Sequence, residues 1–374
     1  MNVWGCVGRQ YNLGELYCGP GGIAWAAQHA AAGPEDGQWS IGHTWATDID
    51  QNTCETYRAN ICGGNDGTVH CNDVRQLEFG ELGKIDALAF GFPCNDFSVV
   101  GEHKGINGSY GPLYSYGVKA LDYFKPEWFL AENVGGLRSA NGGSALETIL
   151  RELSDAGPGY NISPHLYHFE QYGVPQSRHR IIIVGFRRDL DLKFKIPAPT
   201  TKDKDKMVTC REAIEDVPIP EYVTNNERTR QSQAVIERLE HIRPGQNAFN
   251  SDLPDKLKLN VKGARLSQIY KRLDPDLPSY TITGSGGGGT HVYHWDEPRA
   301  LTNRERARLQ TFPDDFEFFG SKESVRRQIG MALPPEGTRL ILEAVLKTAA
   351  GIPYESVKQS IPFPKKQSEQ LQLC

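Results

Sequence analysis

The sequence predicts an α/β fold, with a doubly wound, mostly parallel sheet and a smaller second domain. Short apolar segments alternate with helical stretches through residues 11–190, and this pattern is typical of a parallel sheet covered by helices. Residues 195–275 are instead polar, dotted with prolines and weakly periodic. We therefore expect a first domain at residues 11–190, a second domain with a return segment at 191–300, and helices at 301–350 that complete the first domain.

Turn residues separate the predicted strands and helices along the chain. Apolar runs bounded by turn residues predict strands at residues 11–18, 44–47, 85–90, 128–131, 166–169 and 180–186. Helical stretches are expected at residues 23–32, 50–60 and 337–349. The segment Thr302-Asn303-Arg304-Glu305 has the spacing of a capping box, so a further helix should begin there.

Composition indicates an ordinary globular protein that stays in a reducing compartment. Hydrophobic residues make up 39% and charged residues 23% of the 374, as in typical globular domains. The longest aliphatic run, at residues 181–184, is too short to cross a bilayer, and no signal peptide is evident, so we expect a cytoplasmic protein with no membrane partner. The eight cysteines form no CxxC pair, so neither a disulfide framework nor a metal site is predicted.

The charge of the chain is unevenly distributed. The net charge is −5, but residues 187–275 hold 18 Lys and Arg against 14 Asp and Glu. A locally basic segment suits contact with phosphates, although such a segment is more often only a solvated surface.

A glycine-rich turn and two acids suggest a pocket for an adenosine-type ligand. The turn 18–22 lies between the first predicted strand and its helix, where glycines let the backbone approach a ligand. Asp48 ends the second strand, where a carboxylate can bind ribose hydroxyls. Asp73 follows a third strand, which precedes the strand at residues 85–90, and could bind an adenine amino group. Each feature alone is about as often a plain turn or a helix cap, so a nucleotide, a flavin or no ligand all remain open.

Reactive residue types follow the ends of later strands. Cys94 lies beyond a strand in a proline-containing turn, a place that permits substrate access and a lowered pKa. Glu132 ends the next strand, where a carboxylate is usually either capped or functional. Arg178 and Arg180 alternate as the chain enters a strand, which predicts either a surface strand end or an anion clamp.

These segments, taken together, resemble the motif series of the DNA cytosine-C5 methyltransferases of bacterial restriction–modification systems. The matching segments are Glu15-Leu16-Tyr17-Cys18-Gly19-Pro20-Gly21-Gly22, Gly91-Phe92-Pro93-Cys94, Glu132-Asn133-Val134, Gln176-Ser177-Arg178-His179-Arg180, Arg299-Ala300-Leu301-Thr302-Asn303-Arg304-Glu305 with Gln310-Thr311-Phe312-Pro313, and residues 328–335. Their order and spacing match across nearly the whole chain, apart from the middle segment.

The resemblance implies both a reaction and a division of labour. The fold would be a methyltransferase sheet that uses S-adenosyl-L-methionine, and residues 191–300 would recognise the target sequence in double-stranded DNA. The Cys94 thiolate would add to C6 of a cytosine flipped out of the duplex, and Glu132 would protonate N3. Arg178 and Arg180 would position the base, while the loop 95–111 would close over it. The protein would act as a monomer, beside a restriction endonuclease that cuts the same site.

The resemblance also assigns binding residues, and Met331 is the largest of the departures from the family. The positions matching cofactor contacts are Tyr17, Gly19, Gly21, Gly22, Asp48, Ile49, Asp73, Val74, Pro93 and Leu113. The DNA contacts would include Ser98, Lys104 and Gln176, and no residue is assigned to a metal. Met331 stands where the family normally has Asn, whose side chain can form hydrogen bonds that Met cannot.

Three other interpretations compete with this one. An RNA methyltransferase of the same fold would need no recognition domain of about eighty residues. A DNA-binding protein without activity would not need both Cys94 and Glu132. A dinucleotide oxidoreductase would explain the glycine turn but neither of those two residues.

Overall fold

A computed structural model describes residues 8–34, 37–63, 65–92, 113–138, 143–260 and 267–363. The strands are β1 (Gln10–Leu16), β2 (Ala31–Ala32), β3 (Trp39–Asp48), β4 (Val69–Cys71), β5 (Ala87–Gly91), β6 (Trp128–Val134), β7 (Tyr160–His168), β8 (Gln176–Ser177), β9 (His179–Arg187), β10 (Ile196–Pro197), β11 (Ser279–Tyr280) and β12 (Ser356–Val357). The helices are α1 (Gly22–Gln28), α2 (Gln51–Ile61), α3 (Tyr114–Phe124), α4 (Ser144–Asp155), α5 (Cys210–Ile214), α6 (Gln233–Glu240), α7 (Asn303–Leu309), α8 (Lys322–Met331) and α9 (Pro335–Ala349).

The central sheet confirms the predicted α/β class and has a mixed topology. Its strand order is β2-β3-β1-β5-β6-β9-β7, with β4 paired to β3. The pairs formed among β1, β3, β4, β5 and β6 are parallel, whereas β2 is antiparallel to β3 and β9 is antiparallel to both β6 and β7. The carboxyl ends of the parallel strands therefore meet at one edge, where the start of β9 also lies.

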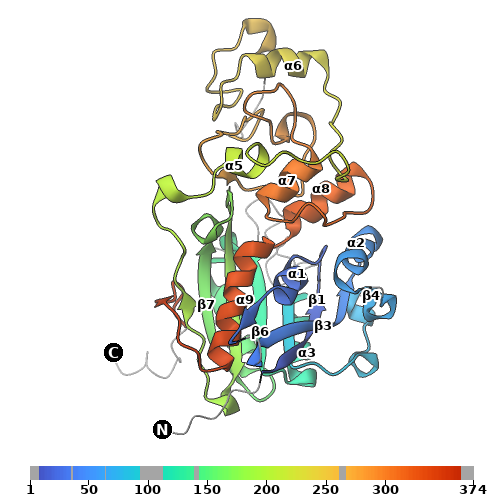
Figure 1. Cartoon of the computed structure of the whole chain (residues 1–374), viewed down its shortest axis with the longest axis vertical. Helices are drawn as coiled ribbons and strands as arrows, with labels where there is room; N and C mark the ends of the chain where they lie inside the picture. The colour runs from blue at the N-terminus through green and yellow to red at the C-terminus, as the bar shows by residue number, and fades with distance from the viewer. Residues whose placement is uncertain are drawn as a thin grey trace.

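Helices cover both faces of this sheet (Figure 1). Alternate residues of β5 point to opposite sides: Ala87 and Ala89 pack with α1 and α9, while Leu88 and Phe90 pack with α3 and α4. Since both faces are buried, the central strands are almost continuously apolar rather than alternating. This burial explains why the apolar runs predicted the strands well.

Some boundaries differ from those predicted. Residues 31–32, expected at the end of the first helix, instead form β2 and pair antiparallel with β3. The strands β3 and β7 are longer than predicted, because partly exposed polar residues within them interrupt the apolar pattern. The predicted capping box is confirmed: the Thr302 side chain accepts the Glu305 N–H and the Glu305 carboxylate accepts the Thr302 N–H.

The second lobe has little regular structure and a small core of its own. Figure 1 shows α6 at the end farthest from the sheet, with α5 nearer to it. Leu239, Ile242, Ala248 and Leu253 pack there with Tyr293. Figure 1 also shows α7 and α8 between this lobe and the sheet, and both helices share a hydrophobic cluster with α1 and α2.

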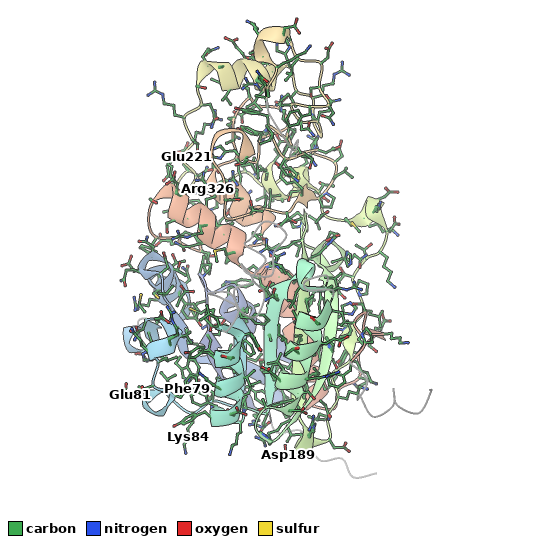
Figure 2. All side chains as sticks on the ribbon, turned by 180° about the vertical axis from the view of Figure 1, so that it is seen from behind. Phe79, Glu81, Lys84, Asp189, Glu221 and Arg326 are labelled. Atoms are coloured by element: carbon green, nitrogen blue, oxygen red, sulfur yellow. The ribbon has the colours of Figure 1, made fainter. Side chains whose placement is uncertain are left out.

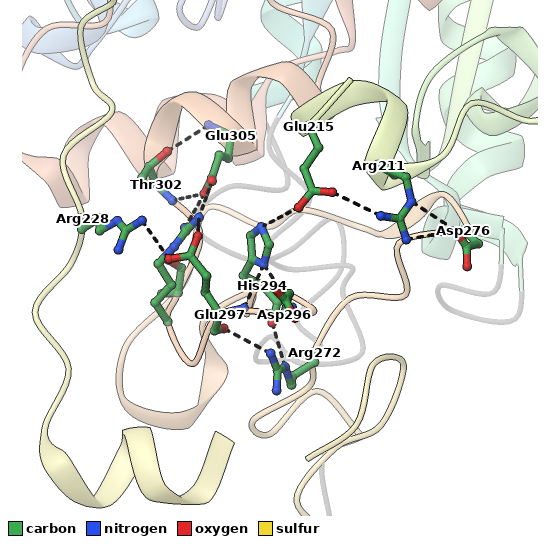
Figure 3. A network of polar contacts seen from close by, with 12 residues as sticks. Arg211, Glu215, Arg228, Arg272, Asp276, His294, Asp296, Glu297, Thr302 and Glu305 are labelled. Carbon is green, nitrogen blue, oxygen red and sulfur yellow. Dashed lines mark hydrogen bonds and ion pairs between the residues drawn. The ribbon is translucent and has the colours of Figure 1, made fainter. Parts of the chain in front are cut away.

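A polar network stabilises the base of the second lobe (Figure 3). The Arg299 guanidinium donates to both oxygens of Glu305 at 2.8 and 2.7 Å, and to Glu297 at 2.9 Å. The buried His294 accepts the N–H groups of Asp296 and Glu297 at Nδ1. This network joins α7 to the chain that precedes it, so the segment 294–305 is held as one unit.

The edge of the sheet where the carboxyl ends of the parallel strands meet faces the second lobe. Asp189 follows the end of β9, and Figure 2 shows it with Lys84 at the far end of the large lobe from Arg326 on α8. The start of β9 therefore lies at the end nearer to α8. Residues at the carboxyl ends of β1, β3, β5 and β6 share this position.

No helix in the ranges given above is both long and apolar enough to cross a membrane.

Candidate active site

The glycine turn after β1 has the geometry expected of a ligand cradle. Gly19 and Gly21 adopt φ values of 58° and 105°, a region that side chains disfavour. A Cβ on Gly19 would meet no atom within 4 Å, so the backbone there is open. A Cβ on Gly22 would lie 2.5 Å from the Leu333 carbonyl oxygen, so α1 can begin this close to the chain after α8 only with glycine.

The structure brings one predicted acid to this turn and the other to the end of the neighbouring strand β4. Asp48 ends β3, and its carboxylate accepts the N–H of Gly19 at 3.1 Å and of Asp50 at 3.0 Å. Burial raises the pKa of Asp48, although these backbone donors act against the rise. Asp73 follows β4, which pairs with β3. Hydrogen bonds from the Arg75 side chain and from the Arg75 backbone N–H lower the pKa of the Asp73 carboxylate.

Four further predicted cofactor residues lie near the same edge of the sheet. The Tyr17 hydroxyl donates to the carbonyl of Leu113 at 2.7 Å, so two residues far apart in sequence meet there. Ile49, directly after Asp48, is 70% exposed. An exposed apolar side chain beside a carboxylate suits a ligand with a flat apolar ring and polar hydroxyls. Val74 is buried behind Asp73.

Glu132 and Arg180 form an ion pair at the carboxyl end of β6. The Arg180 Nε lies 2.9 Å from Glu132 Oε1, and the two side chains are 13% and 15% exposed. Burial raises the pKa of Glu132, while the charges of Arg180 and Arg178 oppose that rise. The result is a largely buried carboxyl group whose proton affinity is above normal and which one arginine orients.

The neighbouring end of β5 leaves room beside this carboxylate. Gly91 pairs with Glu132 in register, and a Cβ there would lie 3.1 Å from Glu132 Oε2. The buried Asn133 side chain donates to the Phe92 carbonyl at 3.1 Å, which fixes the last described residue of this segment. Pro93, Cys94, Ser98 and Lys104 lie outside the described residues.

Two predicted site residues have structural roles instead. Gln176 is fully buried: its amide donates to the Leu309 carbonyl and the Gln310 side chain and accepts the Ile282 N–H. A side chain bonded in this way cannot reach DNA, so the expected DNA contact is corrected. Arg178 is also fully buried.

The Arg178 guanidinium donates to three backbone carbonyls, those of Ile282, Gly330 and Ala332, at 2.8–3.0 Å. Burial lowers the pKa of Arg178. The expected direct contact with the base is therefore replaced by a supporting role, in which Arg178 ties the start of β9 to the end of α8. A Cβ on Gly330 would lie 2.1 Å from the Gly284 nitrogen, so this junction is tight.

A cavity of about 730 Å³ lies next to the Glu132–Arg180 pair. Arg138, His179 and Arg180 contribute basic side chains to its wall, and Gly135, Leu166 and Thr281 complete much of the rest. A cavity with this lining suits an anionic, partly apolar ligand such as a nucleotide.

The sequence motifs did not reveal the buried network behind the turn. Tyr57 donates its hydroxyl to Glu15 Oε2 at 2.5 Å, and His43 contacts the same hydroxyl at 3.1 Å. Burial raises the pKa of Glu15 to about 8. A charged residue inside the apolar strand β1 was the only available signal. Met331, the departure noted above, is 69% exposed at the end of α8.

Two solved structures share the fold of this chain. A candidate DNA modification methyltransferase encoded within an Escherichia coli prophage aligns with a TM-score of 0.69 at 22% identity, over 90% of this chain and 99% of the other. The Dnmt2 methyltransferase of S. pombe aligns with a TM-score of 0.52 at 18% identity, over 91% and 98%. At these identities the likeness shows the fold.

The chain belongs to the C-5 cytosine-specific DNA methylase family, whose model matches residues 11–347. It is 58% identical over 369 residues to the Type II methyltransferase M.BbvI of Brevibacillus brevis, covering 97% of this chain and 98% of the relative. The DNA (cytosine-5-)-methyltransferase M.ApeKI of Aeropyrum pernix is 30% identical over 417 residues, covering 77% and 88%. The protein is therefore an enzyme of the DNA (cytosine-5-)-methyltransferase class.

Proposed function

We propose that this enzyme transfers a methyl group from S-adenosyl-L-methionine to C5 of a cytosine within a specific duplex DNA sequence, through addition of Cys94 to C6. The observation that carries this proposal is the buried Glu132 carboxyl, oriented by Arg180 beside the end of β5. Cys94 lies two residues beyond Phe92 in the sequence, and Asn133 fixes the Phe92 carbonyl next to Glu132.

The residues around the glycine turn fit the proposed methyl donor. The open backbone at Gly19 and the carboxylate of Asp48 suit the amino-acid and ribose portions, while Ile49 and Asp73 suit the faces and edge of adenine. Pro93 and Leu113 would complete the pocket. When bound, the donor supplies a methyl group on a positively charged sulfur, which is a good leaving group.

The chemistry of the base follows from two residues. The Cys94 thiolate would form a bond to C6 while Glu132 gives its proton to N3, so that electron density moves to C5. C5 then takes the methyl group. Loss of the C5 proton to a base and of the Cys94 thiolate from C6 restores the aromatic ring, and N3 returns its proton. A carboxyl group with a raised pKa is suited to the first of these proton transfers.

Access to C6 requires the cytosine to leave the duplex, because its faces are stacked between neighbouring bases. The cavity beside Arg180 has space and basic side chains to receive the extruded nucleotide and its phosphates. We assign recognition of the target sequence to residues 191–300. Residues 95–111 would close over the flipped-out base. The Type II names of the relatives favour a cognate restriction endonuclease that acts on the same site.

The direct test is methyl transfer from S-adenosyl-L-methionine labelled in its methyl group. Genomic DNA without cytosine methylation and total tRNA are supplied separately, and the products are digested to nucleosides. We expect labelled 5-methyl-deoxycytidine from DNA and none from tRNA. Label in tRNA alone, or on another atom of DNA, would refute the proposal.

A further inference from the structure

Two histidines and a glutamate lie close together where the end of β7 pairs with the start of β9. His168 and His179 are direct partners in the antiparallel register of these strands, so both side chains lie on the same face. Their ring centroids are 4.0 Å apart. Glu170, in the short turn after β7, reaches the same point. This is the one group of three or more such ligands found in the described part of the chain.

Two of the contacts within this cluster compete for one proton when both imidazoles are neutral. His179 Nε2 lies 2.8 Å from Glu170 Oε1 and 3.1 Å from His168 Nδ1. His168 Nδ1 is 3.7 Å from the same Glu170 oxygen. In neutral imidazole each nitrogen either donates or accepts, so a single proton on His179 Nε2 would have to serve both neighbours. The other Glu170 oxygen, Oε2, is buried and has no hydrogen-bond partner, in a residue only 9% exposed.

The same distances match the edges of a coordination polyhedron. Bonds of about 2.0–2.2 Å from a metal to nitrogen and oxygen place neighbouring ligand atoms about 2.9–3.5 Å apart. The separations of 2.8, 3.1 and 3.7 Å bracket this range. We propose that His168, Glu170 and His179 bind a divalent transition-metal ion through His168 Nδ1, His179 Nε2 and the Glu170 carboxylate.

The donor set selects the kind of metal. Two imidazoles and one carboxylate suit zinc, cobalt or nickel, whereas magnesium and calcium prefer oxygen ligands alone. The Glu170 side chain is 12% exposed, while those of His168 and His179 are 40% and 45% exposed. The open side leaves coordination positions for water or a phosphate oxygen, as three-ligand sites usually do.

The proposed metal site adjoins the cavity beside Arg180, because His179 belongs to both. His179 lines the cavity beside Arg180, and the Arg180 side chain donates to the His179 carbonyl at 2.9 Å. A metal that joins His179 to the end of β7 would therefore fix the backbone from which Arg180 reaches Glu132. The ion would bind the folded state alone and so stabilise it.

Titration with metal tests the proposal without depending on methyl transfer. Chelator-treated enzyme is titrated with Zn²⁺ and, separately, with Mg²⁺ by calorimetry, and its thermal unfolding midpoint is followed. We expect one Zn²⁺ per chain, a raised midpoint, and no comparable Mg²⁺ binding. His168→Ala and Glu170→Gln should each weaken Zn²⁺ binding about 10-fold or more. His241→Ala is the matched control, because His241 is an exposed histidine in the second lobe, and it should bind as the unmodified enzyme does.

A cobalt titration separates this site from the cysteines. Co²⁺ held by imidazole and carboxylate gives visible absorption without the near-ultraviolet charge-transfer band of a thiolate ligand. Glu170→Gln preserves the size of the side chain, and circular dichroism checks its fold. Absence of Zn²⁺ binding, equal binding by the folded His168→Ala and Glu170→Gln variants, or a thiolate band that accounts for all bound Co²⁺ would overturn the proposal.

Discussion

Replacing Glu132 with Gln isolates the proton that the proposed mechanism assigns to this residue. The amide keeps the shape of the side chain, and its oxygen can still accept from Arg180 Nε, which lies 2.9 Å from Glu132 Oε1. It cannot give a proton to N3. General acid catalysis contributes about a hundred- to ten-thousand-fold, so the barrier should rise by about 3–5 kcal/mol.

The same substitution also has a structural cost, which a matched variant can measure. Removing the charge from a largely buried pair leaves Arg180 less well compensated, at a cost of about 1–3 kcal/mol in unfolding free energy. Glu127, just before the other end of β6, forms hydrogen bonds of 2.9 and 3.0 Å with Arg9. Glu127→Gln should therefore reduce stability in the same way while leaving the methylation rate unchanged.

The assay is single-turnover methyl transfer with enzyme in excess over a DNA duplex, across a range of pH. Because burial raises the pKa of Glu132, the unmodified enzyme should lose rate as pH rises through that pKa and the acid loses its proton. The Glu132→Gln enzyme should be slow and lack this pH dependence. A Glu132→Gln rate equal to that of the unmodified enzyme would remove Glu132 from the catalytic step.

Three further predictions concern stability and specificity. Arg178→Met should lower the free energy of unfolding by at least about 2 kcal/mol, because the carbonyls of Ile282 and Gly330 would each lose a buried donor worth about 1–3 kcal/mol. Urea unfolding measures this change, and an unchanged midpoint would contradict the supporting role of Arg178. The buried Glu15 has a pKa raised to about 8, so the folded state binds more protons than the unfolded state and stability should fall as pH rises from about 5 to 8. Glu15→Gln should flatten that slope in thermal unfolding, and an identical slope would exclude Glu15 as its cause. Exchanging residues 195–275 for the matching segment of a relative with another target should redirect methylation, as bisulfite sequencing would show, and an active chimera that keeps the original sites would place specificity elsewhere.

Local sequence pattern predicted the central strands because these strands are buried on both faces. Leu88, Phe90 and their neighbours in β5 contact helices on either side, so an apolar run was the right signal. The capping box at Thr302 was predictable for the same local reason. Alternation alone could not place β2, whose two alanines pair with β3 only because the chain turns back beside it.

Some residues of the candidate site could be located from the sequence and others could not. The turn and Asp48 were predictable, because strand ends in a parallel sheet meet at one edge. Gln176 and Arg178 were not, since the groups that bury them lie more than 100 residues away in sequence. The cluster of His168, Glu170 and His179 likewise depends on the register between β7 and β9, which spacing along the chain does not reveal.

A covalent trap tests the proposed reaction most directly. Duplex DNA carrying 5-fluorocytosine at the methylated position cannot lose its C5 substituent, so Cys94 cannot leave C6 after methyl transfer. With S-adenosyl-L-methionine present, we predict a band of enzyme joined to DNA on a denaturing gel, and peptide mapping should place the link at Cys94. The Cys94→Ala enzyme should give no such band. If the unmodified enzyme methylates ordinary duplex of this sequence but yields no trapped complex, or a complex linked through another residue, the proposed mechanism is wrong.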